Sequence, residues 1–464
     1  MSAAPGTGER VLLSSPLTPI APSGQTALHM SHPAAVSSEQ GLVRAIGVRG
    51  LAANILNTTI GAGIFVLPAL AAGQLGTAAP LAYLACAFAM TLVVASFAMA
   101  GSRVSLTGGI YAYVEVAFGP FVGFLTGVLI YLACLLACAG VSSAMAASVG
   151  LVIPGAGAGL GKAVLLGLVF ALLAAMNVRG VALGTRLVEF MTAAKLLPLV
   201  LLVAAGLRWV GADDLHVTLA PPSAIAAASL TLIFAFMGIE VALVPSGEIR
   251  DPSRTVPRAV FLALATSTLI YLSVQLVAHA TLGAELARFT EAPLAEAATR
   301  VFGPWGRALM LAGGTISMLG FMSGDALGTP RNLFAFARDG FFPPLLARLH
   351  PRFHTPAPAI VTHAVLVWTA ACVGSFGALA VISNVALLTA YLLCCASAIA
   401  LARRDVRAGG TPFVVPGGPL VPIAGCLVVA WLLAQATGRE WGVTGATLAV
   451  AILLYLLRAR RVAR

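Results

Sequence analysis

Apolar residues run along most of this chain in long stretches, which short clusters of glycine, proline and charged residues separate. Many stretches reach about twenty residues, the length at which an α-helix crosses the hydrocarbon core of a bilayer. The pattern predicts twelve spans, near residues 46–73, 78–101, 120–149, 162–177, 186–207, 223–246, 258–282, 304–327, 357–376, 379–401, 419–436 and 441–458. The sequence therefore predicts an all-α, polytopic membrane protein with twelve transmembrane helices.

The composition supports this class, because 59% of the 464 residues are hydrophobic and only 9% are charged. Residues 1–40 are rich in Ser, Pro, Ala and Gly and lack a basic region followed by an apolar core, so we expect a disordered cytoplasmic tail rather than a cleaved signal. All seven cysteines fall inside apolar runs, where small buried side chains are expected rather than metal ligands or disulfides. We expect no metal site and no cofactor.

The net charge of +11 is distributed unevenly across the predicted membrane. With the N-terminus inside, twenty of the 27 lysines and arginines fall on the cytoplasmic side, six fall outside, and Lys195 lies within a span. This asymmetry is the positive-inside pattern, so both termini are predicted to be cytoplasmic in a plasma (inner) membrane protein. The positive charge therefore indicates membrane orientation and not nucleic-acid binding.

Two pairs of similar motifs indicate an internal repeat. "IGAGIF" in the first span and "FAFMGIE" in the sixth place Gly61 and Gly238 177 positions apart, and "AFGP" before the third span and "VFGP" before the eighth are 184 apart. Because five is odd, two copies of five spans must have opposite orientations in the membrane, as in secondary transporters. The predicted organisation is a first repeat at 41–207, an inverted second repeat at 223–401, and two further helices at 419–458.

The glycines in the first and sixth spans predict discontinuous helices. Unwinding at Gly61, Ala62 and Gly63 would present free N–H groups at the start of a half-helix, where the dipole also favours an anion. Unwinding near Gly238 would release carbonyls of the sixth span for an ammonium group, and these are the carbonyls of Phe234, Ala235 and Met237. Donors on one helix and acceptors on another describe a site for an α-amino acid. The alternative is that small residues only allow close helix packing.

Two ionisable residues lie at depth in the predicted membrane. Lys195 is nine residues, or about 14 Å of helix, from Arg186 at the inner edge, so it should face protein rather than lipid. Burial disfavours a charged ammonium, so Lys195 either gains and loses a proton during transport or is a permanently paired structural lysine. Glu240 lies at the second break, where it either satisfies unwound amides or acts as a protonatable gate. Asp325, Gln275 and His279 are weaker candidates, expected to form hydrogen bonds between helices.

Four ordered motifs resemble those of the amino acid, polyamine and organocation (APC) transporters, which have the leucine-transporter fold. They are "GAGIFVLP", "GGIYAYVEVAFGP", "FAFMGIEVALVPSGEIRDPSRTVPRAV" and "TPRNLFAFARDGFFP", and the likeness covers about residues 40–460. The resemblance implies that the amides matching Gly61, Ala62 and Gly63 hold a substrate carboxylate. It also implies that carbonyls matching Thr59, Phe234 and Met237 hold the amine.

The resemblance assigns further roles to single residues. Phe234 matches an aromatic gate, Glu240 matches an acid associated with gating or proton sensing, and Lys195 matches a lysine that occupies the sodium site of related transporters. Sodium coupling is thus disfavoured. The predicted substrate-binding positions are Thr59, Ile60, Gly61, Ala62, Gly63, Phe234, Ala235, Met237 and Gly238, with Lys195 and Glu240 in coupling or gating.

The predicted function is amino acid transport by a secondary active, proton-coupled permease. We expect a neutral, small or apolar amino acid, protons and membrane lipid as partners, and leave the oligomeric state open. The alternatives are an amino acid exchanger, a transporter of cationic amino acids or polyamines, and a nutrient sensor that binds without transporting. No catalytic constellation or phosphate-binding loop with coherent spacing occurs, so an enzyme is not expected.

Overall fold

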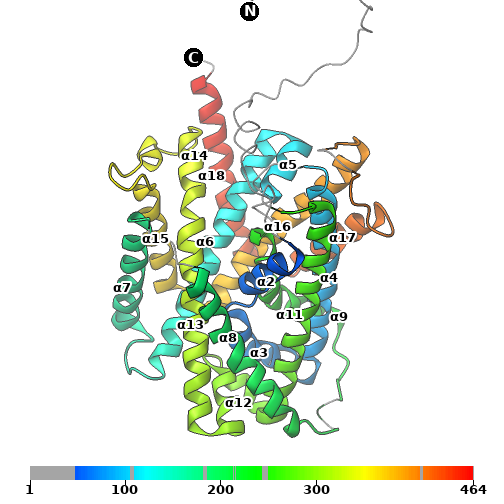
Figure 1. Ribbon diagram of the computed structural model, residues 1–464, viewed down its shortest axis with the longest axis vertical. Coiled ribbons are helices and arrows are strands. Elements are labelled where there is room, and N and C mark those ends of the chain that lie inside the picture. The colour runs from blue at the N-terminus through cyan, green and yellow to red at the C-terminus, as the bar shows by residue number, and fades with distance from the viewer. Residues whose placement is uncertain are drawn as a thin grey trace, which may run out of the picture. The chain divides into compact units, whose positions relative to one another are not determined.

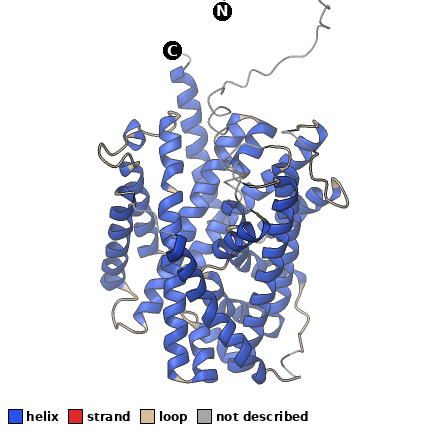
Figure 2. Ribbon diagram, viewed as in Figure 1, coloured by secondary structure: helices blue, strands red, loops and turns tan. Residues whose placement is uncertain are grey.

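The computed structural model describes residues 47–104, 109–180, 185–212, 214, 216–242, 249–407 and 411–462. Within these ranges the side chains of 185–194, 241–242, 252–253 and 459–462 are not described. The predicted tail at 1–40 lies outside the described residues. Every regular element in the described part of the chain is a helix, as Figure 2 shows, which confirms the predicted all-α class.

The helices up to the second break are α2 (Val48–Thr59), α3 (Gly63–Leu75), η2 (Gly76–Ala78), α4 (Ala79–Gly101), α5 (Ile110–Phe118), α6 (Pro120–Gly150), α7 (Gly159–Val178), α8 (Thr185–Gly206), η3 (Leu207–Trp209), α9 (Pro222–Leu232) and η5 (Ile233–Phe236). They are followed by α10 (Ile239–Ala242), α11 (Pro252–Leu282), η7 (Gly283–Arg288), α12 (Pro293–Phe302), α13 (Pro304–Gly328), α14 (Pro330–Arg338), η8 (Pro344–Ala347), α15 (Ala357–Val373), α16 (Phe376–Arg403), α17 (Leu420–Leu433) and α18 (Gly438–Val462). Figure 1 labels most of them.

Six helical segments of the described chain are long and apolar enough to cross a membrane, and three shorter apolar helices accompany them. The six are Gly63–Gly101, Pro120–Gly150, Gly159–Val178, Arg254–Arg288, Phe376–Arg403 and Gly438–Arg458. The protein is therefore an integral, multi-pass membrane protein. Each of the twelve predicted runs coincides with one helix or with consecutive helical pieces, while the number that crosses the bilayer stays a prediction.

Burial separates central helices from peripheral ones. Within α16, 61% of the most apolar window is buried inside the protein, whereas the corresponding share is 22% for α7 and 11% for α18. The central helix α16 packs against α6, α4, α5 and α17, and the Ser383 hydroxyl of α16 donates to the Ala133 carbonyl of α6 at 2.7 Å. The exposed apolar side chains of α7 and α18 are those that a bilayer would cover.

The two "FGP" motifs adopt the same local conformation. Gly119 has φ 90° and ψ 172° between α5 and α6, and Gly303 has φ 79° and ψ −164° between α12 and α13. In each case a short helix ends at a glycine with positive φ and a long helix begins at the following proline, whose fixed φ suits the first helical position. This match supports the predicted repeat, although the repeat as a whole stays a prediction.

Candidate functional site

The first predicted break, Ile60–Ala62, separates α2 from α3. Ile60 has ψ 79°, so the chain leaves the helical conformation there, although its amide still donates to the Leu56 carbonyl at 2.9 Å. The amide of Gly61 then turns back to the Thr59 carbonyl, also at 2.9 Å. The helix resumes at Gly63 and continues for 13 residues.

The amides of Ala62 and Gly63 are the donors that this break offers. Both lie at the N-terminus of α3, where no preceding turn of the same helix supplies a carbonyl and where the helix dipole is positive. The Gly61 amide differs from the prediction, because it already donates to Thr59. The amides that remain available at the first break therefore begin at Ala62.

The second break, Met237–Gly238, follows the short helix η5. Met237 is extended, with φ −75° and ψ 158°, and Gly238 has φ 107°, a conformation that side chains other than hydrogen disfavour. A Cβ atom on Gly238 would also lie 2.8 Å from the carbonyl oxygen of Thr58. Glycine is therefore required here by both backbone conformation and space.

The two breaks lie against each other. The Thr58 hydroxyl of α2 contacts the Gly238 carbonyl at 3.0 Å, and a Cβ on Gly63 would lie 3.3 Å from the Cα atom of Ala235. The Tyr271 hydroxyl of α11 lies between them, 2.6 Å from the Ala235 carbonyl and 3.2 Å from the Thr59 carbonyl. Figure 1 shows α2, α3 and α11 together in the middle of the bundle.

The predicted acceptors at the breaks differ in what they already bind. The carbonyl of Phe234 accepts from the Met237 amide at 3.3 Å, and the carbonyls of Ala235 and Thr59 face Tyr271. Among the described residues, the Met237 carbonyl is the member of this set without a donor. A bound ammonium group would find its freest acceptor at Met237.

Phe234 covers the start of α3. The residue is 8% exposed. Its ring packs edge-on against Phe376 with centroids 5.4 Å apart, and its Cδ1 atom lies 3.4 Å from where a Cβ on Gly63 would be. The ring therefore shields the amides of the first break from one side. This position is compatible with the predicted gate.

Glu240 closes the second break with hydrogen bonds. Its two carboxylate oxygens accept from the Gly238 amide at 3.1 and 3.0 Å, and Oε2 also accepts from the Tyr391 hydroxyl of α16 at 2.6 Å. The side chain is 8% exposed. The Gly238 amide, which has no helical acceptor at the break, thus has a hydrogen-bond partner. The bond between Glu240 and Tyr391 also links α10 to the central helix α16.

Lys195 binds the helix that leads into the first break. Its Nζ donates to the Asn57 carbonyl at 2.6 Å, and the residue is 5% exposed. Asn57 lies two residues before the end of α2. The lysine therefore links α8 to α2 next to the substrate position expected from the sequence.

Tyr271 and Tyr391 support the breaks although the sequence did not single them out. Each is a lone phenol in an apolar helix, and each is fully buried. A buried hydroxyl needs a hydrogen-bond partner, which is the signal that could have drawn attention to them. Their partners, at residues 59, 235 and 240, are 36 to 212 positions away along the chain, so spacing alone could not identify the pairs.

The weaker candidates lie apart from the breaks or lack contacts with them. Asp325 binds His363 of α15 and Thr329 of its own helix, which agrees with the predicted bond between helices. The Gln275 amide and His279 Nδ1 are buried with no hydrogen-bond partner among the described residues. Within the same residues no group of three or more His, Cys, Asp or Glu is placed to hold a metal ion.

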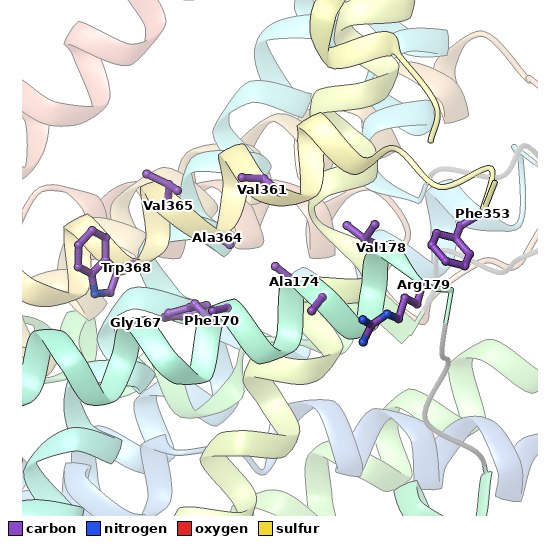
Figure 3. Close-up of a pocket in the computed structure, with 12 residues that line it drawn as sticks. Gly167, Phe170, Ala174, Val178, Arg179, Phe353, Val361, Ala364, Val365 and Trp368 are labelled. Carbon is purple, nitrogen blue, oxygen red and sulfur yellow. The ribbon is translucent and has the colours of Figure 1, made fainter. Parts of the chain in front are cut away.

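A cavity of about 610 Å³ lies elsewhere, between α7 and α15. Figure 3 shows apolar side chains of these two helices facing each other, with Arg179 at one end. Apart from Arg179 the cavity is lined by apolar or aromatic side chains such as Phe170, Val361 and Trp368. It offers few polar partners for a zwitterion, so we regard the two breaks as the better candidate substrate site.

The fold and the site define a class before any comparison is made: an integral membrane protein whose two interrupted helices meet inside the bundle. The family model for amino acid permeases matches residues 46–457, and the chain belongs to this family of the APC group. This confirms the resemblance found in the sequence. The protein is therefore a transporter and not an enzyme.

Individual relatives extend over most of the chain. An uncharacterized transporter of Mycobacterium tuberculosis is 34% identical over 82% of this chain and 83% of its own length. The serine/threonine exchanger of Bacillus subtilis is 29% identical over 85% of this chain and 92% of its own. The branched-chain amino acid permease of the same organism is 23% identical over 92% of this chain and 96% of its own.

Proposed function

We propose that the protein is a secondary active transporter that carries a neutral amino acid by alternating access, coupled to protons and independent of sodium. The contact between the two breaks is the observation that carries the proposal. It places Gly63, at the start of α3, against Ala235, where a Cβ on Gly63 would lie 3.3 Å from the Ala235 Cα atom, and it joins Thr58 to Gly238 at 3.0 Å. The available amides of Ala62 and Gly63 and the available carbonyl of Met237 thus belong to the two segments that meet. Opposite ends of a zwitterion would bind these two groups.

The proposed backbone contacts bind only the carboxylate and the ammonium group, which all amino acids share. The substrate's side chain must therefore be selected by other residues around the site. The two acids considered for binding a cationic side chain are already engaged, Glu240 by Gly238 and Tyr391, and Asp325 by His363 and Thr329. A cationic substrate would therefore have to displace existing hydrogen bonds. The names of the related serine/threonine exchanger and branched-chain amino acid permease also favour a neutral substrate.

Lys195 supports independence from sodium and coupling to protons. Its ammonium group lies next to the first break and donates to the Asn57 carbonyl, so a fixed cation is already present where a sodium ion would otherwise stabilise unwound backbone. Loss of a proton from Nζ would weaken this link between α8 and α2. Proton release there would thus favour movement of α2 between the two access states.

The proposal includes the membrane arrangement: twelve spans, two inverted repeats of five, and both termini in the cytoplasm. The matching conformations at Gly119 and Gly303 support the repeat, and the two helix breaks occupy corresponding positions in the first spans of the two halves. We assign the protein to the plasma (inner) membrane on the positive-inside distribution of its charges.

A second candidate function is obligatory exchange, since one relative is a serine/threonine exchanger. Purified protein in liposomes separates the two. Uptake of radiolabelled neutral amino acids into empty vesicles, increased by an inside-alkaline pH gradient and unchanged by replacing sodium with potassium, is expected for proton-coupled transport. Uptake only into vesicles preloaded with amino acid would instead establish exchange. Stimulation by sodium would contradict the proposed coupling.

A further inference from the structure

Outside the two breaks, a carboxylate and an imidazole are paired inside the helical bundle. Asp325 Oδ2 of α13 and His363 Nε2 of α15 lie 2.8 Å apart, and their side chains are 6% and 2% exposed. Ionisable side chains at membrane depth are costly and are usually retained for ion or proton binding. The amino acid site described above uses neither residue.

Every polar atom of the pair has a partner. The second oxygen of Asp325 accepts from the Thr329 hydroxyl at 2.6 Å. The second ring nitrogen of His363, Nδ1, lies 3.3 Å from the Tyr131 hydroxyl of α6. Three helices thus meet at one polar cluster, which we call the Asp325–His363–Tyr131 cluster.

The cluster can satisfy two protonation states of the imidazole. In the neutral ring, Nε2–H donates to Asp325 while Nδ1 accepts from the Tyr131 hydroxyl. After a proton is added at Nδ1, both ring nitrogens donate, and the Tyr131 oxygen becomes an acceptor when its hydroxyl rotates. No hydrogen bond is lost in either state, and the Asp325 carboxylate lies at hydrogen-bond distance from the ring in both.

Other groups that face the cluster come from three helices. Cys134 and Cys138 of α6 lie near Asp325, and Cys134 is also near Glu240 of α10, which in turn binds Tyr391 of α16. Other charged side chains lie on α13 and on the helices that pack against α13 and α15. Among the described residues, each of them either has another partner or is exposed. They are Lys162, Arg179, Lys195, Glu296, Arg300, Arg307, Arg331 and Arg338. None of these supplies a counter-charge inside the cluster.

Asp325 lies three residues before the end of α13 at Gly328. Its own side chain is buried, but Gly324, Leu327 and Gly328 around it are exposed. The carboxylate thus lies within one helical turn of the end of α13.

We infer that the Asp325–His363–Tyr131 cluster is a proton-binding site of the transporter, separate from Lys195 and Glu240, in which His363 Nδ1 takes up the proton and Asp325 remains ionised. Its part in transport rests on the proposed proton coupling. The binding of the proton itself does not.

The first test is a titration of purified protein in nanodiscs with ¹⁵N-labelled histidine. The signals missing from His363→Gln identify the ring, and we expect them to change from a neutral to a doubly protonated imidazole between the highest and the lowest pH at which the protein stays folded. In Asp325→Asn the ring loses its carboxylate partner, so the pH dependence of these signals should differ from that of wild type. A ring that keeps one protonation state throughout this range would overturn the inference, whatever the transport assay shows.

The second test is uptake measured at a series of equal internal and external pH values. His363→Gln and Asp325→Asn should shift or flatten the pH profile, and Tyr131→Phe should shift it less while keeping a titrating ring. His279→Gln is the matched control, since His279 is also a histidine in an apolar helix but forms no ion pair with an acidic side chain among the described residues. Profiles identical to wild type in both cluster variants would contradict a role in transport. A wild type insensitive to pH, with a titrating His363, would instead count against the proposed proton coupling alone.

Discussion

The two helix breaks are similar in sequence but differ in how completely the protein satisfies them. At the second break Gly238 is required by its φ of 107° and by the Thr58 carbonyl, and its amide is bound by Glu240. At the first break a Cβ on Gly61 would only reach ordinary contact with Phe321, at 3.7 Å, and Ala62 and Gly63 present amides at a helix start.

This difference indicates that the two breaks have different roles, one in stability and one in substrate binding. The second break is mainly structural: Gly238, Glu240 and Tyr391 hold one conformation there, and the Met237 carbonyl remains available as an acceptor. The first leaves backbone donors available and so has the groups that a ligand needs. The predictions below test whether stability depends mainly on the second break and binding mainly on the first.

Gly238→Ala should have the largest effect on stability. An alanine at φ 107° costs about 1–3 kcal/mol in backbone strain, and its Cβ would in addition overlap the Thr58 carbonyl. We expect a much lower melting temperature in detergent, with little folded protein recovered. Gly61→Ala is the matched comparison and should melt near the wild-type temperature. Equal melting of the two variants would remove the distinction between the breaks.

Lys195→Gln should have the largest effect on coupling. The glutamine amide is a hydrogen-bond donor, but it is one bond shorter than lysine and cannot carry a positive charge or release a proton in the same way. We expect uptake to fall at least tenfold and its dependence on a pH gradient to disappear, while the melting temperature changes little. Measuring uptake in proteoliposomes at several pH gradients checks this. Unaltered proton dependence would assign Lys195 a purely structural role.

Glu240→Ala should destabilise the protein by about 1–3 kcal/mol, because the buried Gly238 amide and the Tyr391 hydroxyl both lose their acceptor. Glu240→Gln keeps an acceptor oxygen and should lose less stability. Chemical or thermal unfolding of the two variants gives the comparison. If the glutamine variant is fully stable but insensitive to pH in transport assays, Glu240 acts in gating as well as in structure.

Tyr271→Phe should have the smallest effect, a loss of about 0.5–1.5 kcal/mol, since one hydroxyl that bridges the breaks is removed and the ring packing is kept. The freed carbonyls of Thr59 and Ala235 would become additional acceptors near the site. We therefore expect the affinity for the amino acid to change by severalfold in a scintillation proximity binding assay. If neither stability nor affinity changes, the Tyr271 hydroxyl contributes neither to holding the two breaks together nor to substrate binding.

The sequence predicted the class, the helix breaks and the family because these depend on local signals. Long apolar runs identify membrane helices, and "IGAG" and "FMGI" place glycine where a helix is interrupted. The short helices α5, α12 and α14 in the connections between spans were not predicted. They are stabilised by packing against the helical bundle, and that packing is not visible in the local sequence.

The contacts that complete the site depend on the three-dimensional fold and could not be read locally. Tyr271, Tyr391 and His363 each bind a group from a different helix, and no spacing rule relates the partners. The hydrogen bond from the Gly61 amide to the Thr59 carbonyl likewise depends on how the chain turns at the break, which the sequence does not specify. Sequence identified which segments carry the site, and the structure showed which of their polar groups remain available.

The most direct test of the amino acid site is a high-resolution structure of the protein in lipid nanodiscs with a transported amino acid bound. The account predicts that the carboxylate lies within hydrogen-bond distance of the Ala62 and Gly63 amides and that the ammonium lies near the Met237 carbonyl. Density for the amino acid away from both breaks, for example in the cavity between α7 and α15, would contradict it.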